Sequence, residues 1–279
     1  MHNLTTSGLP LSWDHEQLRL VFGPGMDEVE PAVRKVKEIQ DVLYRGEDGS
    51  MVFEDDPDQV LYYMYRDIHL REDTQLFRNK GIRYDITILI PGTVGQEYVK
   101  TAGHYHPLKP GTNTTYPEVY EVLYGRAHYL IQRPKALVKP EKGLEEIIVF
   151  FAEAGDKVLI PPGFGHITIN PGTGFLVMSN LVAEDFSSVY EPLQKMKGAG
   201  YFQLSSEQEK PHFVPNSHCP SLPPLQICLP TEFPAMSLLK DIPLYRAFLK
   251  NPDSFVFLTD PEDYLEEFQA YLSTRKNVF

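Results

Sequence analysis

Residues 155–170, with the sequence GDKVLIPPGFGHITIN, decide the fold of this chain. Lys157–Ile160 has the composition of a short strand, and Pro161-Pro162-Gly163 follows it directly. Proline and glycine in this order are typical of a tight turn, because proline presets one backbone angle and glycine tolerates the left-handed region. His166 follows within three residues of that glycine. We therefore predict a short strand followed by a turn that presents one imidazole.

Upstream of this stretch lies a second set of residues with metal-ligand chemistry. His104 and His106 are two residues apart, so on a strand both imidazoles point to one face and can reach one ion. Glu118 is a third candidate, and it shares its strand face with Tyr120. Together with His166 this makes three imidazoles and one carboxylate. Such a set suits a divalent Fe, Mn, Ni, Zn or Co ion and leaves coordination positions open.

The middle of the chain alternates short strand-like runs with turns that contain proline or glycine. No helical periodicity separates these runs, so we predict an antiparallel sandwich or barrel rather than βαβ units. The predicted strands are Val60–Tyr65, Tyr84–Ile90, Tyr116–Tyr124, Ala127–Gln132, Glu146–Phe151, Lys157–Ile160 and Phe175–Val182.

The two flanks have different patterns. Residues 28–45 repeat apolar side chains at helical spacing, which predicts an N-terminal helix. From Pro211 to Pro234 there are seven prolines, and we expect such a stretch to supply neither a central strand nor a long helix. Residues 237–249 look helical but are interrupted at Pro243.

A last helix is predicted to begin at Asp260, which is an N-cap residue followed by proline and two acids. Its apolar face would consist of Leu265, Phe268, Tyr271 and Leu272. We therefore divide the chain into an N-terminal segment (1–50) packed on a barrel, the barrel itself (51–195), and a proline-rich arm with C-terminal helices (196–279).

Composition limits the possible partners. The chain has 26 basic and 38 acidic residues and a formal charge of −12, and no basic stripe interrupts this surplus. Nucleic acid and anionic membrane surfaces are therefore disfavoured. The same field would repel a phosphorylated small molecule unless a local site compensates.

The cellular compartment is predicted from what the sequence lacks. Cys219 and Cys228 match neither a redox pair nor a zinc-finger pair, so we interpret them as free thiols. The longest apolar run, Ile147–Ala152, is far shorter than the about 20 residues of a membrane span. No secretory signal is evident near the N-terminus. We expect a cytoplasmic protein.

With these residues in view, the chain resembles the cupin superfamily. The segment 155–170 matches the second cupin motif at every fixed position, and the segment from His104 to Gly125 matches the metal-binding part of the first. It departs from the first motif because no glycine stands six residues before His104 and because eleven residues separate His106 from Glu118. The resemblance implies an all-β cupin barrel (double-stranded β-helix, or jelly roll). The second-motif matches are Gly155, Pro161, Gly163, His166 and Asn170.

A narrower resemblance covers residues 80–190. The segment 87–106, TILIPGTVGQEYVKTAGHYH, is similar to the signature of the cupin-type glucose-6-phosphate isomerases first recognised in archaea. The resemblance implies one divalent transition metal, with iron as the first candidate, held by His104, His106, Glu118 and His166. It implies that Thr87, Thr101 and Gly103 help to hold a substrate phosphate and that Tyr120 lines that site. A tyrosine expected near 181–182 is absent, where Leu181 and Val182 stand.

The function implied is the interconversion of glucose 6-phosphate and fructose 6-phosphate. A metal ion would polarise the carbonyl, and Glu118 is the candidate base that moves the proton, although a metal-bound carboxylate is a weaker base than a free one. Hydride transfer without a base stays open. Two other function classes stay open as well: a metal-dependent oxygenase or oxidoreductase, and a non-catalytic sugar-phosphate-binding cupin.

Three further expectations concern residues around the motif and the assembly. Glu97 is expected to be an exposed strand or turn acid rather than a substrate ligand. Lys100 is either solvated or a charge partner of the phosphate. By analogy with other cupins we expect a homodimer.

Overall fold

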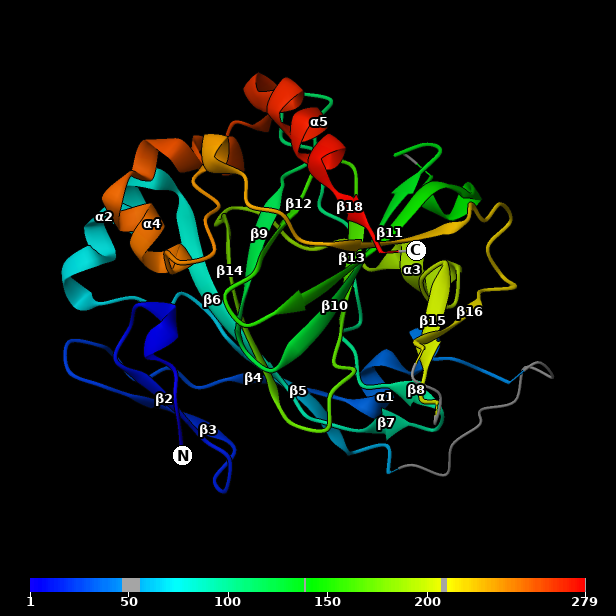
Figure 1. Cartoon of the computed structure of the whole chain (residues 1–279), viewed down its shortest axis with the longest axis horizontal. Coiled ribbons are helices and arrows are strands. Elements are labelled where there is room, and N and C mark those ends of the chain that lie inside the picture. The colour runs from blue at the N-terminus through cyan, green and yellow to red at the C-terminus, as the bar shows by residue number, and fades with distance from the viewer. Residues whose placement is uncertain (47–55, 138, 207–209, 279) are drawn as a thin grey trace.

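The computed structural model describes residues 1–46, 56–137, 139–206 and 210–278 of the chain. Two larger β-sheets face each other in the middle of the molecule (Figure 1). A six-stranded sheet has the order β12-β9-β14-β6-β5-β4, and a five-stranded sheet has the order β13-β10-β11-β17-β18. In the first sheet the strands are β12 (Lys157–Ile160), β9 (Glu118–Tyr124), β14 (Leu176–Ala183), β6 (Ile82–Leu89), β5 (Val60–Tyr65) and β4 (Ala32–Lys35). In the second they are β13 (Gly165–Ile169), β10 (Arg126–Pro134), β11 (Leu144–Glu153), β17 (Leu225–Leu229) and β18 (Lys276–Asn277).

In the described residues, two small sheets and five short α-helices surround this pair. One sheet is formed by β1 (His2–Asn3), β2 (Leu11–Asp14) and β3 (Arg19–Phe22), and the other by β16 (His212–Pro215), β15 (Tyr201–Leu204), β8 (Glu97–Tyr98) and β7 (Thr93–Val94). The helices are α1 (Val36–Ile39), α2 (Thr74–Lys80), α3 (Glu191–Lys195), α4 (Leu244–Lys250) and α5 (Leu265–Thr274). Strands dominate, so the predicted all-β cupin class is confirmed, and in the described residues the two large sheets are not joined into a closed barrel.

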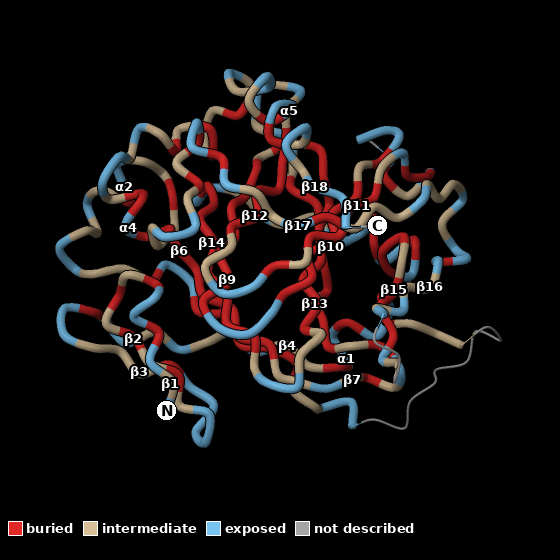
Figure 2. The backbone as a smooth tube through the Cα atoms, in the orientation of Figure 1, coloured by how far each residue is buried: buried red, intermediate tan, exposed pale blue. Residues whose placement is uncertain are grey.

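The central strands β9, β14 and β6 of the six-stranded sheet are buried on both faces, as the red tube in the centre of Figure 2 shows. Along β14, Leu176 and Met178 point to a cluster shared with the five-stranded sheet, whereas Val177 and Leu181 point to a second cluster. The second cluster contains the N-terminal hairpin and the C-terminal helices, including Trp13. Since neighbouring residues of a strand point to opposite faces, a strand buried on both faces is apolar almost throughout.

The C-terminal helices are attached to this sheet by buried polar contacts. Glu121 on β9 forms a 2.9 Å ion pair with Lys157 on β12, and its second carboxylate oxygen accepts the Leu244 N–H at the start of α4 (2.7 Å). The Tyr271 hydroxyl of α5 accepts the N–H of Leu159 (3.1 Å). Each contact satisfies a buried backbone or charged group, so the helices hold fixed positions against the strands.

The predicted N-terminal helix over residues 28–45 is wrong. Residues 32–35 form β4, which pairs antiparallel with β5, and only α1 and a short 3-10 turn follow. Val36 and Ile39 are buried as the helical spacing requires, but Val33 is 37% exposed on the edge strand. The segment pairs with the edge of β5, which would otherwise have unpaired backbone groups. Local periodicity contains no information about that edge. The boundary predicted near residue 50 lies outside the described residues.

The proline-rich stretch also differs from the prediction. Leu225–Leu229 is free of proline and forms β17, which lies between β11 and β18 in the five-stranded sheet. Five residues without proline are enough for a ladder, so the expectation that no central strand can occur here was wrong. Further along, α4 begins directly after Pro243, as the interruption there predicted.

The last helix is preceded by a 3-10 turn over Pro261–Tyr264. Phe268 and Tyr271 are buried as predicted, but Leu265 is 50% exposed, so the predicted apolar face was one residue too wide. Within the described residues no helix has both the length and the apolar character needed to span a membrane.

A pH-dependent contribution to stability is expected from His128 on β10. Burial lowers the pKa of this imidazole to about 4, below its usual 6.5, and its Nδ1 contacts Gln203 Oε1 at 2.7 Å. Between pH 6.5 and 4 the unfolded chain therefore binds a proton that the folded chain does not. The free energy of unfolding should fall as the pH drops through this window, by up to about 1.4 kcal/mol per pH unit from this residue.

The test is to compare urea unfolding of the wild type and His128→Gln between pH 4 and 7. The variant should show a shallower pH dependence, with His212→Gln, at an exposed position of β16, as the control for loss of a histidine. An unchanged slope in His128→Gln would contradict the assignment.

Candidate metal centre

A backbone bridge joins the two histidine motifs. The N–H of His104 donates to the carbonyl of His166 (3.1 Å), and the N–H of His166 donates to the carbonyl of His104 (3.0 Å). The two residues are thus direct cross-strand partners, with ring centroids 4.4 Å apart. His106, two residues along the chain, lies on the same side. One pair of hydrogen bonds therefore brings all three imidazoles to one place.

Glu118 begins β9 and approaches the same point from the six-stranded sheet. Its Oε2 atom lies 3.3 Å from His106 Nε2 and 3.2 Å from His166 Nε2. His104 Nε2 lies 3.1 Å from His106 Nε2, and one ligand atom from each of the four residues falls within 4.8 Å of all the others. Metal–ligand bonds of about 2.0–2.2 Å at tetrahedral or octahedral angles separate ligand atoms by about 3–3.5 Å. The three pairs His104–His106, His166–Glu118 and His106–Glu118, at 3.1, 3.2 and 3.3 Å, have this spacing.

Hydrogen bonding around the cluster supports a metal ion rather than a network of protons. His106 Nδ1 contacts the Tyr116 carbonyl at 2.8 Å, so Nδ1 carries the proton and Nε2 presents a lone pair. Glu118 Oε2 is buried and accepts no hydrogen bond among the described residues. The lone pairs of His106 Nε2 and Glu118 Oε2 thus face each other at 3.3 Å without a donor between them. A cation at their centre removes this conflict, and the donor set fits a first-row divalent ion.

The ionisation states also suit metal binding. Burial lowers the pKa of His104 well below its usual value, and the neighbouring imidazoles of His166 and His106 lower it further. Burial by itself would raise the pKa of Glu118, but the close His106 and His166 imidazoles outweigh it and hold the pKa well below its usual range. Neutral imidazole and ionised carboxylate are the forms that bind metals.

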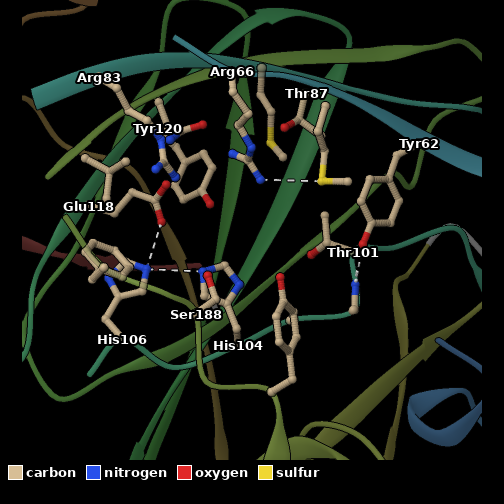
Figure 3. A pocket seen from close by; sticks show the side chains of 18 residues that line it. Tyr62, Arg66, Arg83, Thr87, Thr101, His104, His106, Glu118, Tyr120 and Ser188 are labelled. Atoms are coloured by element: carbon tan, nitrogen blue, oxygen red, sulfur yellow. Dashed lines mark hydrogen bonds and ion pairs between the residues drawn. The ribbon is translucent and has the colours of Figure 1, made fainter. Parts of the chain in front are cut away.

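The residues predicted to hold a phosphate line the same pocket as the ligands (Figure 3). Thr101 accepts the Thr168 N–H through its hydroxyl (3.0 Å), and Thr87 faces the pocket from β6. Gly103 has φ = +73°, and a Cβ there would lie 2.3 Å from Ile167, so this position requires glycine. The structure therefore brings Thr87, Thr101 and Gly103 together beside the cluster.

Tyr120 contacts the cluster directly. Its phenol oxygen is 3.1 Å from His166 Nε2. Burial, together with the nearby Glu118 carboxylate, raises the pKa of this phenol well above its usual value. Tyr120 is therefore a protonated hydrogen-bond donor that points at the centre.

The strands of the six-stranded sheet deliver these side chains in rows. In the paired registers, residues directly opposite each other on neighbouring strands share one face, and every second residue of a strand repeats that face. The three rows that line the pocket are Met64–Thr87–Met178, Asp85–Asn180–Tyr120 and Arg83–Val182–Glu118.

The charged arginine and aspartate side chains in or next to these rows were not predicted from the sequence. Arg66, directly after β5, and Arg83 on β6 both line the pocket, and both pair with the fully buried Asp85. The sequence contained a signal for Arg83 and Asp85, because these two residues and Thr87 follow one another at intervals of two and therefore share one face of a strand. Tyr62 and Tyr190 also line the pocket, and Tyr190 supplies an aromatic side chain near the position where the expected tyrosine is absent.

The expectations for Glu97 and Lys100 were both wrong. The two side chains are 2% exposed and form a 2.7 Å ion pair with each other. Lys100 also donates to the Val42 carbonyl (2.6 Å), and Glu97 accepts the Tyr44 N–H (2.7 Å). Sequence showed neither residue to be buried, because the segment that covers them is more than 50 residues away in the chain. The pair connects the N-terminal segment to the strand that leads into the histidine motif.

Comparison with known proteins identifies the family. The family model described as "Glucose-6-phosphate isomerase (GPI)" matches residues 33–214, a span that contains all four candidate ligands. The chain belongs to the glucose-6-phosphate isomerase family. The predicted resemblance to the cupin-type members of this family is therefore confirmed.

Individual relatives of the family are moderately similar. The glucose-6-phosphate isomerase of Thermococcus litoralis is 29% identical over 157 residues, which are 56% of this chain and 71% of that protein. The glucose-6-phosphate isomerase of Thermococcus gammatolerans is 31% identical over 140 residues, which are 50% of this chain and 62% of that protein. Among solved structures, oxalate decarboxylase from Bacillus subtilis aligns with a TM-score of 0.33 at 19% identity, over 54% of this chain and 35% of that chain.

Metal binding can be tested directly. Metal-free protein titrated with Ni²⁺ should bind one ion per chain in calorimetry. His166→Gln should weaken binding by more than about 10–100-fold, the cost of losing only an outer-shell partner of a ligand. His212→Gln, remote in sequence and exposed, should retain wild-type affinity. Equal affinities of His166→Gln and wild type would contradict the site.

Proposed function

We propose that this protein is a metal-dependent isomerase that interconverts glucose 6-phosphate and fructose 6-phosphate. The observation that carries the proposal is one pocket in which the cluster of three histidines and Glu118 adjoins Thr87, Thr101 and Gly103. The first group suits the carbonyl end of a sugar, and the second offers hydroxyl and backbone N–H groups to a phosphate. Family membership supports the same reaction.

The proposed metal ligands are His104, His106, Glu118 and His166, with iron as the first candidate. When bound, a divalent ion supplies Lewis-acid polarisation of the sugar carbonyl. The remaining tasks fall to the protein. Thr87, Thr101 and Gly103 orient the phosphate, which places C1 and C2 near the cluster.

Glu118 is the proposed base. Conversion of glucose 6-phosphate to fructose 6-phosphate removes a hydrogen from C2 and adds it at C1, while one proton moves from O2 to O1. The low pKa of Glu118 keeps it ionised and able to accept a proton, but also makes it a weak base. The Tyr120 phenol, which stays protonated, is placed to donate a hydrogen bond to a substrate oxygen. A homodimer and a cytoplasmic location stay predictions.

Metal removal tests the function. Protein treated with EDTA should lose fructose 6-phosphate isomerisation in a coupled assay and regain it with Fe²⁺, Mn²⁺ or Ni²⁺. Metal-loaded protein that binds the sugar phosphate without converting it would favour the non-catalytic alternative. Oxygen consumption with an organic substrate would favour the oxygenase alternative.

Substitution of the base tests the mechanism. Glu118→Gln should lower kcat by about 10²–10⁴-fold, the usual contribution of a positioned acid or base. Metal content is measured in the same preparation, so that loss of the ion is distinguished from loss of the base. Glu153→Gln, at an exposed position of β11, is the matched control and should keep wild-type turnover. Full activity of metal-loaded Glu118→Gln would displace Glu118 from this role.

A further inference from the structure

The wall of the pocket carries a charged group that the proposed mechanism does not use. Arg66 Nη1 donates to Asp85 Oδ2 (2.6 Å), and Arg83 Nε donates to the same oxygen (2.9 Å). The Asp67 N–H donates to the other carboxylate oxygen (3.0 Å). The Asp85 side chain is fully buried, whereas those of Arg66 and Arg83 are 45% and 25% exposed. Two guanidinium groups thus share one carboxylate, which leaves a net positive charge on the wall.

The guanidinium of Arg66 points into the pocket. In Figure 3 it lies between Glu118 on one side and Thr87 on the other. Within the described part of the chain, its other hydrogen bond goes to the weak acceptor Met64 Sδ (3.4 Å), so donor capacity remains. Asn180, 2% exposed and in the same row as Asp85, has an Nδ2 group without a partner in the described residues. Unused donors from two residues therefore face the space beside the cluster.

A purely structural role does not explain Arg66. Asp85 retains Arg83 and the Asp67 N–H as partners when Arg66 is removed, so the buried carboxylate does not depend on Arg66 alone. The positive charge of Arg66 offsets an unfavourable field at this position. The chain has a charge of −12, and the field of the chain opposes any negative charge that forms in the pocket.

We propose that Arg66 is a further catalytic residue, which binds the oxygens on C1 and C2 of the sugar and stabilises the negative charge that develops on them. This proposal rests on the proposed isomerase function. In the reaction the hydrogen lost from C2 is regained at C1, and the proton lost from O2 is regained at O1, so no oxidant or reductant is consumed. With either proton or hydride transfer, charge passes through these two oxygens. Asp85 and Arg83 are positioning residues that hold the Arg66 guanidinium, and Asn180 is a neutral donor beside it.

Binding of two sugar-phosphate analogues separates this role from phosphate binding. 5-Phosphoarabinonate carries a carboxylate at the reacting end, whereas sorbitol 6-phosphate carries a neutral alcohol there, and both retain the phosphate. For metal-loaded Arg66→Met, binding of 5-phosphoarabinonate should weaken at least about tenfold, as expected for a lost charge-assisted hydrogen bond, and binding of sorbitol 6-phosphate less than about threefold. Arg66→Lys should recover part of the difference.

The control is Arg71→Met, which removes an arginine paired with Asp27 at the surface (2.6 Å). It should bind both analogues as the wild type does. Equal weakening of both analogues in Arg66→Met would assign Arg66 to the phosphate or to pocket shape, and no weakening would remove it from the site. Either result overturns the proposal.

Kinetics provide a readout that a structural role would not change. Arg66→Met should lower kcat for fructose 6-phosphate by about 10²–10³-fold, the usual loss for one oxyanion donor, with less than a tenfold change in KM and unchanged metal content. A change in KM alone would contradict the proposal. If the wild-type protein binds both analogues but converts no sugar phosphate, the proposed function fails. The difference between the two analogues in how much Arg66→Met weakens their binding still shows whether Arg66 contacts an anionic reacting end.

Discussion

The reciprocal hydrogen bonds between His104 and His166 are the interaction on which the site depends. They connect two segments 62 residues apart in the chain and place three imidazoles within reach of one another. The turn at Pro161–Gly163 and the left-handed Gly103 both serve this bridge, because each shapes the backbone next to one of the histidines. The loop between His106 and Glu118 is longer than in the first cupin motif, but it leaves the arrangement intact. Additional loop residues cost little free energy when the strands at the ends of the loop are fixed.

Charge forms the second constraint. An acidic chain has to hold an anionic sugar phosphate in a pocket whose own ligand set includes a carboxylate. The metal ion and the hydroxyls around Thr101 were expected to overcome this repulsion. The structure adds a pocket wall with a net positive charge, made by Arg66, Arg83 and Asp85. The Asp85 carboxylate lies between the two guanidinium groups and offsets part of their mutual repulsion. Negative charge can therefore be stabilised from both sides of the pocket.

The fold around the site could be predicted where side chains carry the information locally. Seven strands between residues 60 and 183 followed from alternation and from turn residues, whereas β7, β8 and β13 were not predicted. The segment over 28–45 was misassigned because β4 exists only through its pairing with β5, a contact that periodicity does not report. Glu97 and Lys100 were misassigned for a related reason: charged residues are normally exposed, and these two are buried only because they neutralise each other beneath Val42 and Tyr44.

The sequence by itself determined the identity of the candidate ligands, since His104, His106, Glu118 and His166 lie in motifs whose spacing on strands already implies one face. It also determined the family, which the match over residues 33–214 bears out. Only the tertiary structure decided which further residues join them. The sheet register places Asp85 on β6 opposite Asn180 on β14, and Arg66, which follows β5, joins them through its 2.6 Å hydrogen bond to Asp85. Register is set by the burial of both sheet faces, and no local segment of the chain contains that information.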